Sequence, residues 1–236
     1  MSGAFLEIQT QTGWGRVLQM FAGWCGVQPG WLALDVGCGP GLLVDELARR
    51  GARAAGVDLD LDALAAGRRY FAQPGALPAG SSSAGGSPEG SSPEGSSPLG
   101  SVPALAQADA PRLPFAAGQF DLLTAVNVLF LLPDPPGALR EMARLLCPGG
   151  LLALLNPSER MSVAAAAALA DARGLAGLER QSLLDWAGRA EAHARWDEAA
   201  LRALLAEAGL RLLRTELKTG PGLARLACAV RQDPAD

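Results

Sequence analysis

The sequence predicts an α/β protein with a mostly parallel sheet and helices on both faces. Residues 31–41, WLALDVGCGPG, begin with the pattern of a short buried strand and end in a glycine-rich turn, and residues 42–51 continue with helical periodicity. Residues 52–58 show a second short strand, and a helical pattern opens near Asp60. Short strands that alternate with helices are typical of parallel sheets, because a parallel connection needs a crossover long enough for a helix.

The composition fits a globular protein with a sizeable core, since 49% of the 236 residues are hydrophobic and 19% are charged. The formal net charge of −4 weighs against a nucleic-acid partner, which usually needs a basic face. The four cysteines are widely spaced, so we expect no metal site and a reduced, cytoplasmic setting. The N-terminal residues lack a basic segment followed by a long apolar run, and we expect no membrane anchor.

The glycine-rich turn carries Gly37, Gly39 and Gly41, which would let a ligand approach the backbone closely. A dinucleotide-binding fingerprint would need glycine where Leu42 stands, and a P-loop would need Gly-Lys-Ser/Thr. The carboxylate of Asp35, just before the turn, would repel a phosphate but attract an ammonium group. Alternatively, Asp35 hydrogen-bonds only the backbone of its own turn.

Three acidic residues follow the second strand. Asp58 ends that strand about 20 residues past the glycine turn, where a carboxylate can accept hydrogen bonds from ribose hydroxyls. Asp60 is better explained as a helix N-cap and Asp62 as a first-turn acid that favours the helix dipole.

These segments, LDVGCGPG followed by GVDLD, resemble the class I S-adenosylmethionine-dependent methyltransferases. Residues 107–129 resemble the third and fourth strands of that family. Residues 139–157 resemble its following helix, Pro-Gly-Gly turn and fifth strand, and the segment from Trp196 resembles its closing helix and strand. The resemblance implies a Rossmann-like, doubly wound sheet of seven strands with a small helical cap.

The resemblance also implies S-adenosylmethionine as cofactor and S-adenosylhomocysteine as product. Asp35 would contact the amino-acid end of the cofactor, Asp58 the ribose and Asp109 the adenine amino group. The other residues expected to contact the cofactor are Gly37, Cys38, Gly39, Gly41, Leu59, Ala110 and Asn127. The methyl group would be transferred by in-line displacement, for which the protein has to align the two reactants and exclude water.

A Ser-Pro-x-Gly-Ser unit occurs three times within residues 74–103. Its composition cannot form a core, so we expect a disordered Gly/Ser/Pro insertion in a surface loop of one domain that spans residues 1–236. The insertion is either neutral, or it binds a partner or shields the cofactor cleft; the low cost of long loops favours neutrality.

Helical segments are expected on both sides of the cofactor motifs. Within a helical segment at 1–30, residues 14–25 predict an amphipathic helix that either packs on the core or serves as a lid. Residues 158–196 are expected to form a helical cap over the acceptor site, including an Ala-rich helix at 162–174 with Ser162 as its N-cap.

The acceptor side offers few candidates for catalysis. Asn127, near the end of the fourth strand, would face either the cofactor or the acceptor. At Phe130 many small-molecule members of the family carry a histidine, so the resemblance implies no general base at that position here. His193, the single histidine, would share a helix face with Trp186 and Ala190, and it is either a general base or an ordinary half-buried residue.

DPPG, residues 134–137, resembles the Asp-Pro-Pro-aromatic motif of amino-methylating nucleic-acid enzymes, but Gly137 replaces the stacking aromatic. Asp134 as N-cap with Pro135 at the first helical position accounts for this tetrapeptide. The sequence therefore predicts a methyltransferase with a small-molecule acceptor and no nucleic-acid or membrane partner. The alternatives are a nucleic-acid or protein methyltransferase, and a cofactor-binding protein without catalysis.

Overall fold

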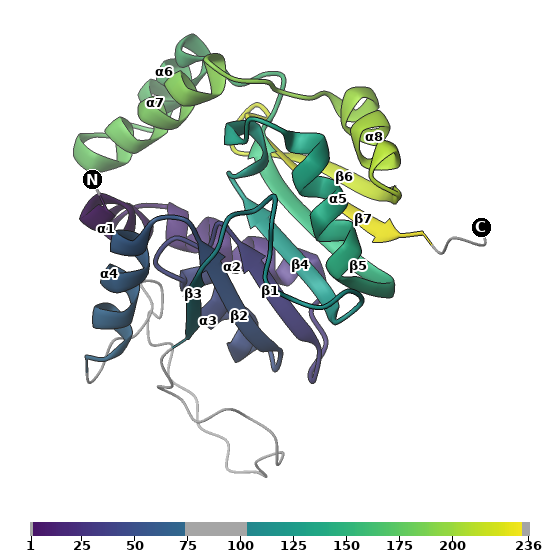
Figure 1. Cartoon of the computed structure of the whole chain (residues 1–236). Coiled ribbons are helices and arrows are strands. Elements are labelled where there is room, and N and C mark those ends of the chain that lie inside the picture. Colours follow the sequence, from purple (N-terminus) through teal and green to yellow (C-terminus); the bar gives the residue numbers. More distant parts are fainter. Residues whose placement is uncertain (1, 74–102, 233–236) are drawn as a thin grey trace, which may run out of the picture.

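A seven-stranded sheet forms the centre of the protein, and helices cover both of its faces (Figure 1). This computed structural model describes residues 2–73 and 103–232, so nearly all of the expected insertion at 74–103 lies outside the described residues. The strands are β1 (Leu32–Val36), β2 (Arg53–Asp58), β3 (Ala104–Gln107), β4 (Phe120–Val126), β5 (Leu146–Pro157), β6 (Leu210–Lys218) and β7 (Ala224–Arg231).

The strand order is β3-β2-β1-β4-β5-β7-β6. Strands β1 to β5 pair in parallel, whereas β7 runs antiparallel to both β5 and β6. The predicted Rossmann-like, mostly parallel sheet of seven strands is therefore confirmed. The order reverses at β1, since the chain proceeds from β1 outward through β2 to β3 and then returns to β4 on the other side of β1.

Sequence signals account for where several helices begin. The side chains of Asp60, Asp134 and Ser162 each accept a hydrogen bond from a first-turn backbone N–H, so all three predicted N-caps are confirmed. Asp197 caps a fourth helix in the same way. The helices are α1 (Ser2–Gln11), α2 (Trp14–Cys25), α3 (Leu42–Arg49), α4 (Leu61–Phe71), α5 (Pro135–Leu145), α6 (Val163–Ala172), α7 (Gly177–Glu191) and α8 (Glu198–Glu207).

Side chains alternate between two hydrophobic clusters along the central strands. On β4, Leu122 belongs to the cluster that includes α2 and α3, and its neighbour Leu123 belongs to the cluster that includes α5 and α8. On β5, Ala153 and Leu154 divide in the same way. This period of two fixes which face of the sheet each helix covers.

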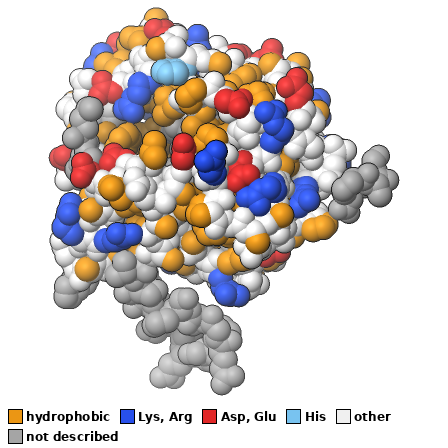
Figure 2. Space-filling model, viewed as in Figure 1, with side chains coloured by type: hydrophobic (Ala, Val, Ile, Leu, Met, Phe, Trp, Pro, Cys, Tyr) orange, Lys and Arg blue, Asp and Glu red, His pale blue; other side chains and the backbone are white. Residues whose placement is uncertain are grey.

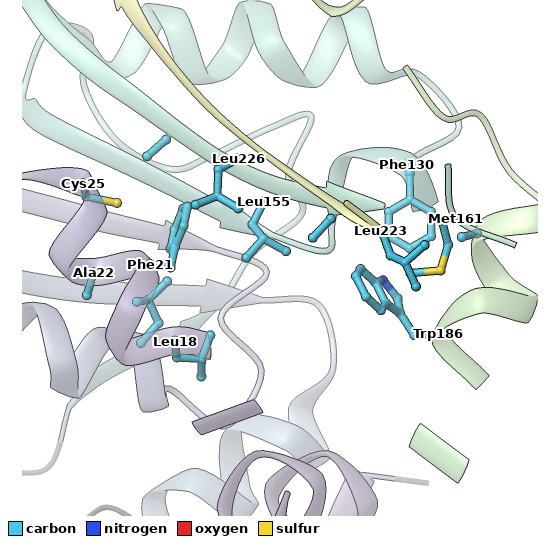
Figure 3. Close-up of a cluster of buried hydrophobic side chains, with 14 of the residues drawn as sticks. Leu18, Phe21, Ala22, Cys25, Phe130, Leu155, Met161, Trp186, Leu223 and Leu226 are labelled. Atoms are coloured by element: carbon cyan, nitrogen blue, oxygen red, sulfur yellow. The ribbon is translucent and has the colours of Figure 1, made fainter. Parts of the chain in front are cut away.

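The first cluster extends from the sheet into the cap. Figure 3 shows Phe21 of α2 close to Leu155 and Leu226 of the sheet, whereas Trp186 of α7 lies beside Phe130 and Leu223. Both α6 and α7 fall within residues 158–196, where the cap is expected. The cap therefore shares one continuous apolar core with the sheet.

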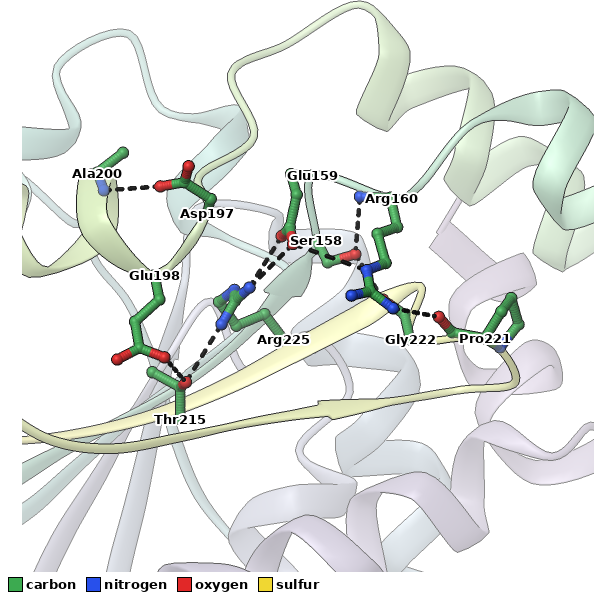
Figure 4. A network of polar contacts seen from close by, with 10 residues as sticks. All are labelled: Ser158, Glu159, Arg160, Asp197, Glu198, Ala200, Thr215, Pro221, Gly222 and Arg225. Atoms are coloured by element: carbon green, nitrogen blue, oxygen red, sulfur yellow. Dashed lines mark hydrogen bonds and ion pairs between the residues drawn. The ribbon is translucent and has the colours of Figure 1, made fainter.

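A network of polar contacts fixes the segment that connects the end of β5 to the cap (Figure 4). The buried guanidinium of Arg225, on β7, donates to both carboxylate oxygens of Glu159 at 3.1 and 3.0 Å. It also donates to Thr215 Oγ1 at 3.2 Å, and Thr215 donates to Glu198 at the start of α8. Because Ser158 Oγ donates to the Gly222 carbonyl at 2.6 Å, the segment that leads into α6 is tied to the β6–β7 turn.

Candidate active site

A cavity of about 410 Å³ lies at the carboxyl ends of β1, β2 and β4. This position is the one at which ligands bind in open α/β sheets, because the chain crosses in opposite directions on the two sides of β1. Residues from α1, α2 and α7 complete its wall. Figure 2 shows a hollow in this face of the molecule with hydrophobic side chains around it.

Two glycines of the turn after β1 line the cavity. Gly37 and Gly39 have φ angles of 73° and 54°, a left-handed conformation that glycine adopts without a steric penalty. A Cβ atom on Gly37 would lie 2.1 Å from Val128 Cγ2, whereas one on Gly39 would have no neighbour within 4 Å. Gly37 therefore permits tight packing of the turn, and Gly39 leaves backbone open toward the cavity.

The Asp58 carboxylate connects this turn to the end of β2. Its Oδ2 accepts a hydrogen bond from the Gly39 amide at 2.7 Å, and its Oδ1 accepts one from the Asp60 amide at 2.8 Å. Each carboxylate oxygen can accept more than one hydrogen bond, so capacity remains for a ligand hydroxyl. Asp60 Oδ1 meanwhile caps α4 by accepting from Asp62 and Ala63, as expected from the sequence.

The segments after β2 and β3 bring three more predicted residues to the cavity wall. Leu59 is 64% exposed and follows Asp58 directly. Asp109 and Ala110 follow β3 and lie on the same wall. The adenine-contacting and ribose-contacting residues expected from the sequence therefore share one cavity.

Asn127 follows β4 with a φ angle of 58°, which is uncommon for a residue other than glycine. Its backbone N–H donates to the Leu155 carbonyl at 2.7 Å, which fixes this conformation. Its side-chain Oδ1 is buried at the cavity wall, and no donor in the described part of the chain reaches it. A buried acceptor without a partner is costly, so this atom suits a donor on a bound ligand.

Three of the predicted cofactor residues do not line the cavity. Asp35 is buried beneath the turn and accepts a hydrogen bond from Thr124 Oγ1 on β4 at 2.7 Å, rather than from its own turn. Burial raises the pKa of Asp35 to about 7, although the hydrogen bond from Thr124 opposes the shift. Cys38 packs in a small apolar cluster and Gly41 precedes α3 with a φ angle of 88°.

Helix α2 packs on the core, which is one of the two roles predicted for it, and its first half also lines the cavity. Trp14 and Leu18, in its first half, line the cavity, whereas Phe21 and Cys25, in its second half, are buried in the core. Trp14 contacts Trp186 of α7 edge-to-face, with ring centroids 5.1 Å apart. The helix is therefore both a core element and part of the cavity wall.

His193 lies outside the cavity wall. It lies two residues beyond the end of α7, its side chain is exposed, and its Nδ1 lies 2.7 Å from the Arg189 carbonyl. Trp186 and Ala190, expected on the same helix face, are buried instead. A general base at His193 stays a prediction.

Several cavity residues carried no signal in the sequence. Phe5 and Gln9 come from α1, and Ser182 and Arg189 come from α7. They reach the cavity only because α1 packs against both α4 and α7, a long-range arrangement that local patterns do not encode.

Among the described residues, no helix has both the length and the apolar character that a membrane span needs.

A family model described as a methyltransferase domain matches residues 34–154, about half of the chain. The chain belongs to this family. The predicted membership of the class I S-adenosylmethionine-dependent methyltransferases is thereby confirmed, and S-adenosylmethionine is the cofactor of these proteins.

Named relatives share the cofactor-binding part of the chain. A ubiquinone biosynthesis O-methyltransferase from Alkalilimnicola ehrlichii is 34% identical over 117 residues, which cover 50% of this chain and 38% of that protein. The protein of the same name from Albidiferax ferrireducens is 37% identical over 134 residues, or 56% of this chain and 44% of the relative. The match therefore spans about two-fifths of the length of these relatives.

Solved structures share the whole fold. A chain in the complex between the Haloferax volcanii Trm112 methyltransferase activator and a methyltransferase aligns with a TM-score of 0.62 at 16% identity, covering 96% of this chain and 92% of that one. Magnesium protoporphyrin IX methyltransferase from Synechocystis PCC 6803, solved with bound S-adenosylmethionine, aligns with a TM-score of 0.59 at 19% identity, covering 93% and 80%. At these identities the likeness establishes the fold alone.

Proposed function

We propose that the protein transfers the methyl group of S-adenosylmethionine to a small-molecule acceptor. One observation carries the proposal: a single cavity joins a carboxylate-rich wall at the strand ends to an apolar, aromatic wall beneath the helices. Donor and acceptor would thus meet in one partly enclosed volume, which the displacement requires. The O-methyltransferase relatives support a small acceptor, since their names refer to ubiquinone biosynthesis.

In this proposal the strand-end residues hold the cofactor. Asp58 accepts from the ribose hydroxyls while it keeps its bonds to the Gly39 and Asp60 amides. Asp109 accepts from the adenine amino group, and Leu59 and Ala110 pack on the adenine. Gly37 and Gly39 line the cavity, and the open space at Gly39 allows the amino-acid end to lie against the turn.

Asp35 acts at a distance in this proposal, because its carboxylate lies beneath the turn rather than on the cavity wall. Its negative charge, once the proton is released, would still favour the positively charged cofactor through a medium of low dielectric constant. Cys38 and Gly41 shape the turn: Cys38 packs inward, and a Cβ on Gly41 would lie 2.8 Å from a methyl carbon of Leu105.

The bound cofactor supplies an electrophilic methyl group, and the chain supplies alignment. The aromatic side chains of Trp14, Phe130 and Trp186 exclude water from the acceptor side of the cavity, and their flat faces can pack against the acceptor. The side-chain oxygen of Asn127 is buried at the cavity wall without a donor among the described residues, so it can accept a hydrogen bond from either ligand.

Calorimetric titration with S-adenosylmethionine and S-adenosylhomocysteine, with NAD as the control ligand, tests the cofactor assignment. We expect both sulfur ligands to bind and NAD not to bind. Methyl transfer is tested separately, by measuring S-adenosylhomocysteine formation from a panel of small aromatic acceptors. Binding without turnover of any acceptor would favour a non-catalytic cofactor-binding protein, whereas turnover only on nucleic acid or protein would refute the small-molecule assignment.

A further inference from the structure

Charge is divided between the two walls of the cavity. The described lining residues include three carboxylates, those of Asp58, Asp60 and Asp109, all at the strand ends. The opposite wall contributes one cation, the guanidinium of Arg189 on α7. The positively charged methyl donor suits the acidic wall, so the wall that carries Arg189 faces the methyl acceptor.

Arg189 has no carboxylate partner in the described part of the chain. Arg180, on the same helix, differs in this respect, since it contacts Asp171 at 2.6 Å. Arg189 instead lies over the Phe5 ring, with its guanidinium carbon 5.6 Å from the ring centroid. An unpaired guanidinium at a cavity wall is suited to bind an anionic group and would repel a protonated amine.

The walls near Arg189 are aromatic. Phe5, Trp14, Phe130 and Trp186 come from four different elements and meet around this half of the cavity. Gln9 Oε1 and Trp186 Nε1 in the same wall are buried, with no partner among the described residues. Flat aromatic surfaces with a few polar atoms favour a planar ligand over a flexible aliphatic one.

Among the described lining residues of this half of the cavity, no side chain is suited to accept a proton near neutral pH, and His193 lies behind Phe130, with ring centroids 6.0 Å apart, rather than on the wall. Apart from the strand-end carboxylates, the polar side chains of the described lining are those of Gln9, Ser182, Arg189 and Asn127, with the indoles of Trp14 and Trp186. An acceptor that loses a proton during transfer would need a base here. An acceptor that arrives already deprotonated would not.

We propose that the acceptor is a planar aromatic compound with an anionic oxygen, a carboxylate or an acidic phenolate, held by Arg189. This inference rests on the proposed methyl transfer. An anionic oxygen of the acceptor forms the new bond to the methyl carbon as the carbon–sulfur bond breaks. The electron pair of that bond stays on sulfur, so the products are a methyl ester or ether and neutral-sulfur S-adenosylhomocysteine, and no proton is released.

The test is calorimetric titration of the protein, first saturated with S-adenosylhomocysteine, with four probes at pH 8. The probes are 2-naphthoate, 4-nitrophenolate, the neutral 2-naphthamide and the cationic 2-(aminomethyl)naphthalene. We expect at least one anionic probe to bind about 5- to 10-fold more tightly than the amide, which is the range for a charge pair that solvent partly screens. Which anion binds better distinguishes a carboxylate from a phenolate acceptor.

Variants assign the effect to Arg189. Arg189→Gln should remove the preference for the anion while S-adenosylhomocysteine affinity stays within about twofold, and Arg189→Lys should keep part of it. Arg180→Gln, on the same helix but outside the cavity lining, is the matched control and should change neither affinity.

Two outcomes would overturn the inference: equal binding of the anionic and neutral probes, or an anion preference that survives in Arg189→Gln. Neither outcome touches the cofactor assignment, which is read from S-adenosylhomocysteine binding in the same titrations. Loss of S-adenosylhomocysteine binding by the wild type would instead refute the proposed function. Arg189→Lys keeps the positive charge, so its preference for the anionic probes can still be measured where the glutamine variant is poorly folded.

Discussion

The amide of Gly39 donates a 2.7 Å hydrogen bond to Asp58 Oδ2, and this contact joins the turn after β1 to the end of β2. The same carboxylate accepts from the Asp60 amide, so one side chain orders the turn, the strand end and the start of α4. A ligand bound by Asp58 would therefore meet a turn that is already in place, with little conformational entropy left to lose.

Replacing Asp58 with alanine should weaken S-adenosylhomocysteine binding by ~1.5–3 kcal/mol, the size of a lost hydrogen bond to a charged group. The variant should also lose stability, because the Gly39 and Asp60 amides lose their acceptor. Calorimetry measures the first effect and urea unfolding the second.

Asp60→Ala is the natural comparison, since Asp60 caps α4 through its own Oδ1. We expect it to lower the free energy of unfolding by ~1 kcal/mol, as for other lost N-caps, with a smaller change in cofactor affinity than Asp58→Ala. If Asp60→Ala weakened binding more than Asp58→Ala, the ribose contact would belong to Asp60.

Alanine at Gly37 and at Gly39 should have different consequences. Both positions have positive φ, which costs a non-glycine residue ~1–2 kcal/mol. Gly37→Ala adds a contact at 2.1 Å with Val128, so we expect a total loss of stability of ~2–4 kcal/mol. Gly39→Ala meets open space, so it should lose only the strain energy but should obstruct the cofactor.

Urea unfolding and S-adenosylhomocysteine titration separate these effects. Val128→Ala combined with Gly37→Ala should recover part of the lost stability, because it removes the contacting methyl groups but leaves the backbone strain. Recovery of no stability in the double variant would mean that the contact with Val128 is not the cause.

Local signals made much of this site predictable. The turn glycines, Asp58 and the N-cap Asp60 lie within one strand–turn–helix unit, where spacing along the chain determines spacing in the structure. The same holds for Asp134 and Ser162, because a helix cap depends only on the next three residues. The order of motifs along the chain, together with the family resemblance, predicted the sheet.

The rest of the site depends on packing between distant elements. Arg189 and Phe5 are separated by most of the chain, and the helices that carry them show no pattern that indicates a cavity-facing side. Asp35 illustrates the opposite difficulty: it was predicted from its position before the turn, but the strand register pairs it with Thr124 beneath the turn. Neither partner can be inferred from neighbours in the sequence.

The pH dependence of stability tests the environment of Asp35. Burial raises its pKa from 3.8 to about 7, so the folded protein retains a proton that the unfolded chain releases from about pH 4 upward. The wild type should therefore lose stability relative to Asp35→Asn as the pH rises from about 4 to 7, by at most ~4 kcal/mol, and the difference should be constant above that window. Urea unfolding of both proteins between pH 4.5 and about 8.5 measures it.

A difference between the two proteins that is independent of pH would show that Asp35 is ionised in the fold. A wild type that gains stability relative to Asp35→Asn with rising pH would show a lowered pKa instead. Thr124→Val provides a second check, because loss of the hydroxyl that stabilises the carboxylate should move the window to higher pH.

Variants of Asn127 test whether its side chain contacts the cofactor or the acceptor. Its Oδ1 is buried without a donor among the described residues, and its φ angle of 58° suits glycine. Asn127→Gly should therefore leave the free energy of unfolding within ~1 kcal/mol of wild type, whereas Asn127→Ala should lose ~1–2 kcal/mol to backbone strain. Both variants should weaken binding of the ligand that donates to Oδ1 by ~0.5–1.5 kcal/mol.

The ligand whose binding is weakened identifies the contact of Asn127. Weaker S-adenosylhomocysteine binding would assign the contact to the cofactor, and weaker 2-naphthamide binding to the S-adenosylhomocysteine-saturated protein would assign it to the acceptor. If both affinities were unchanged in Asn127→Gly, the side chain would contact neither ligand and its role would be confined to the turn after β4.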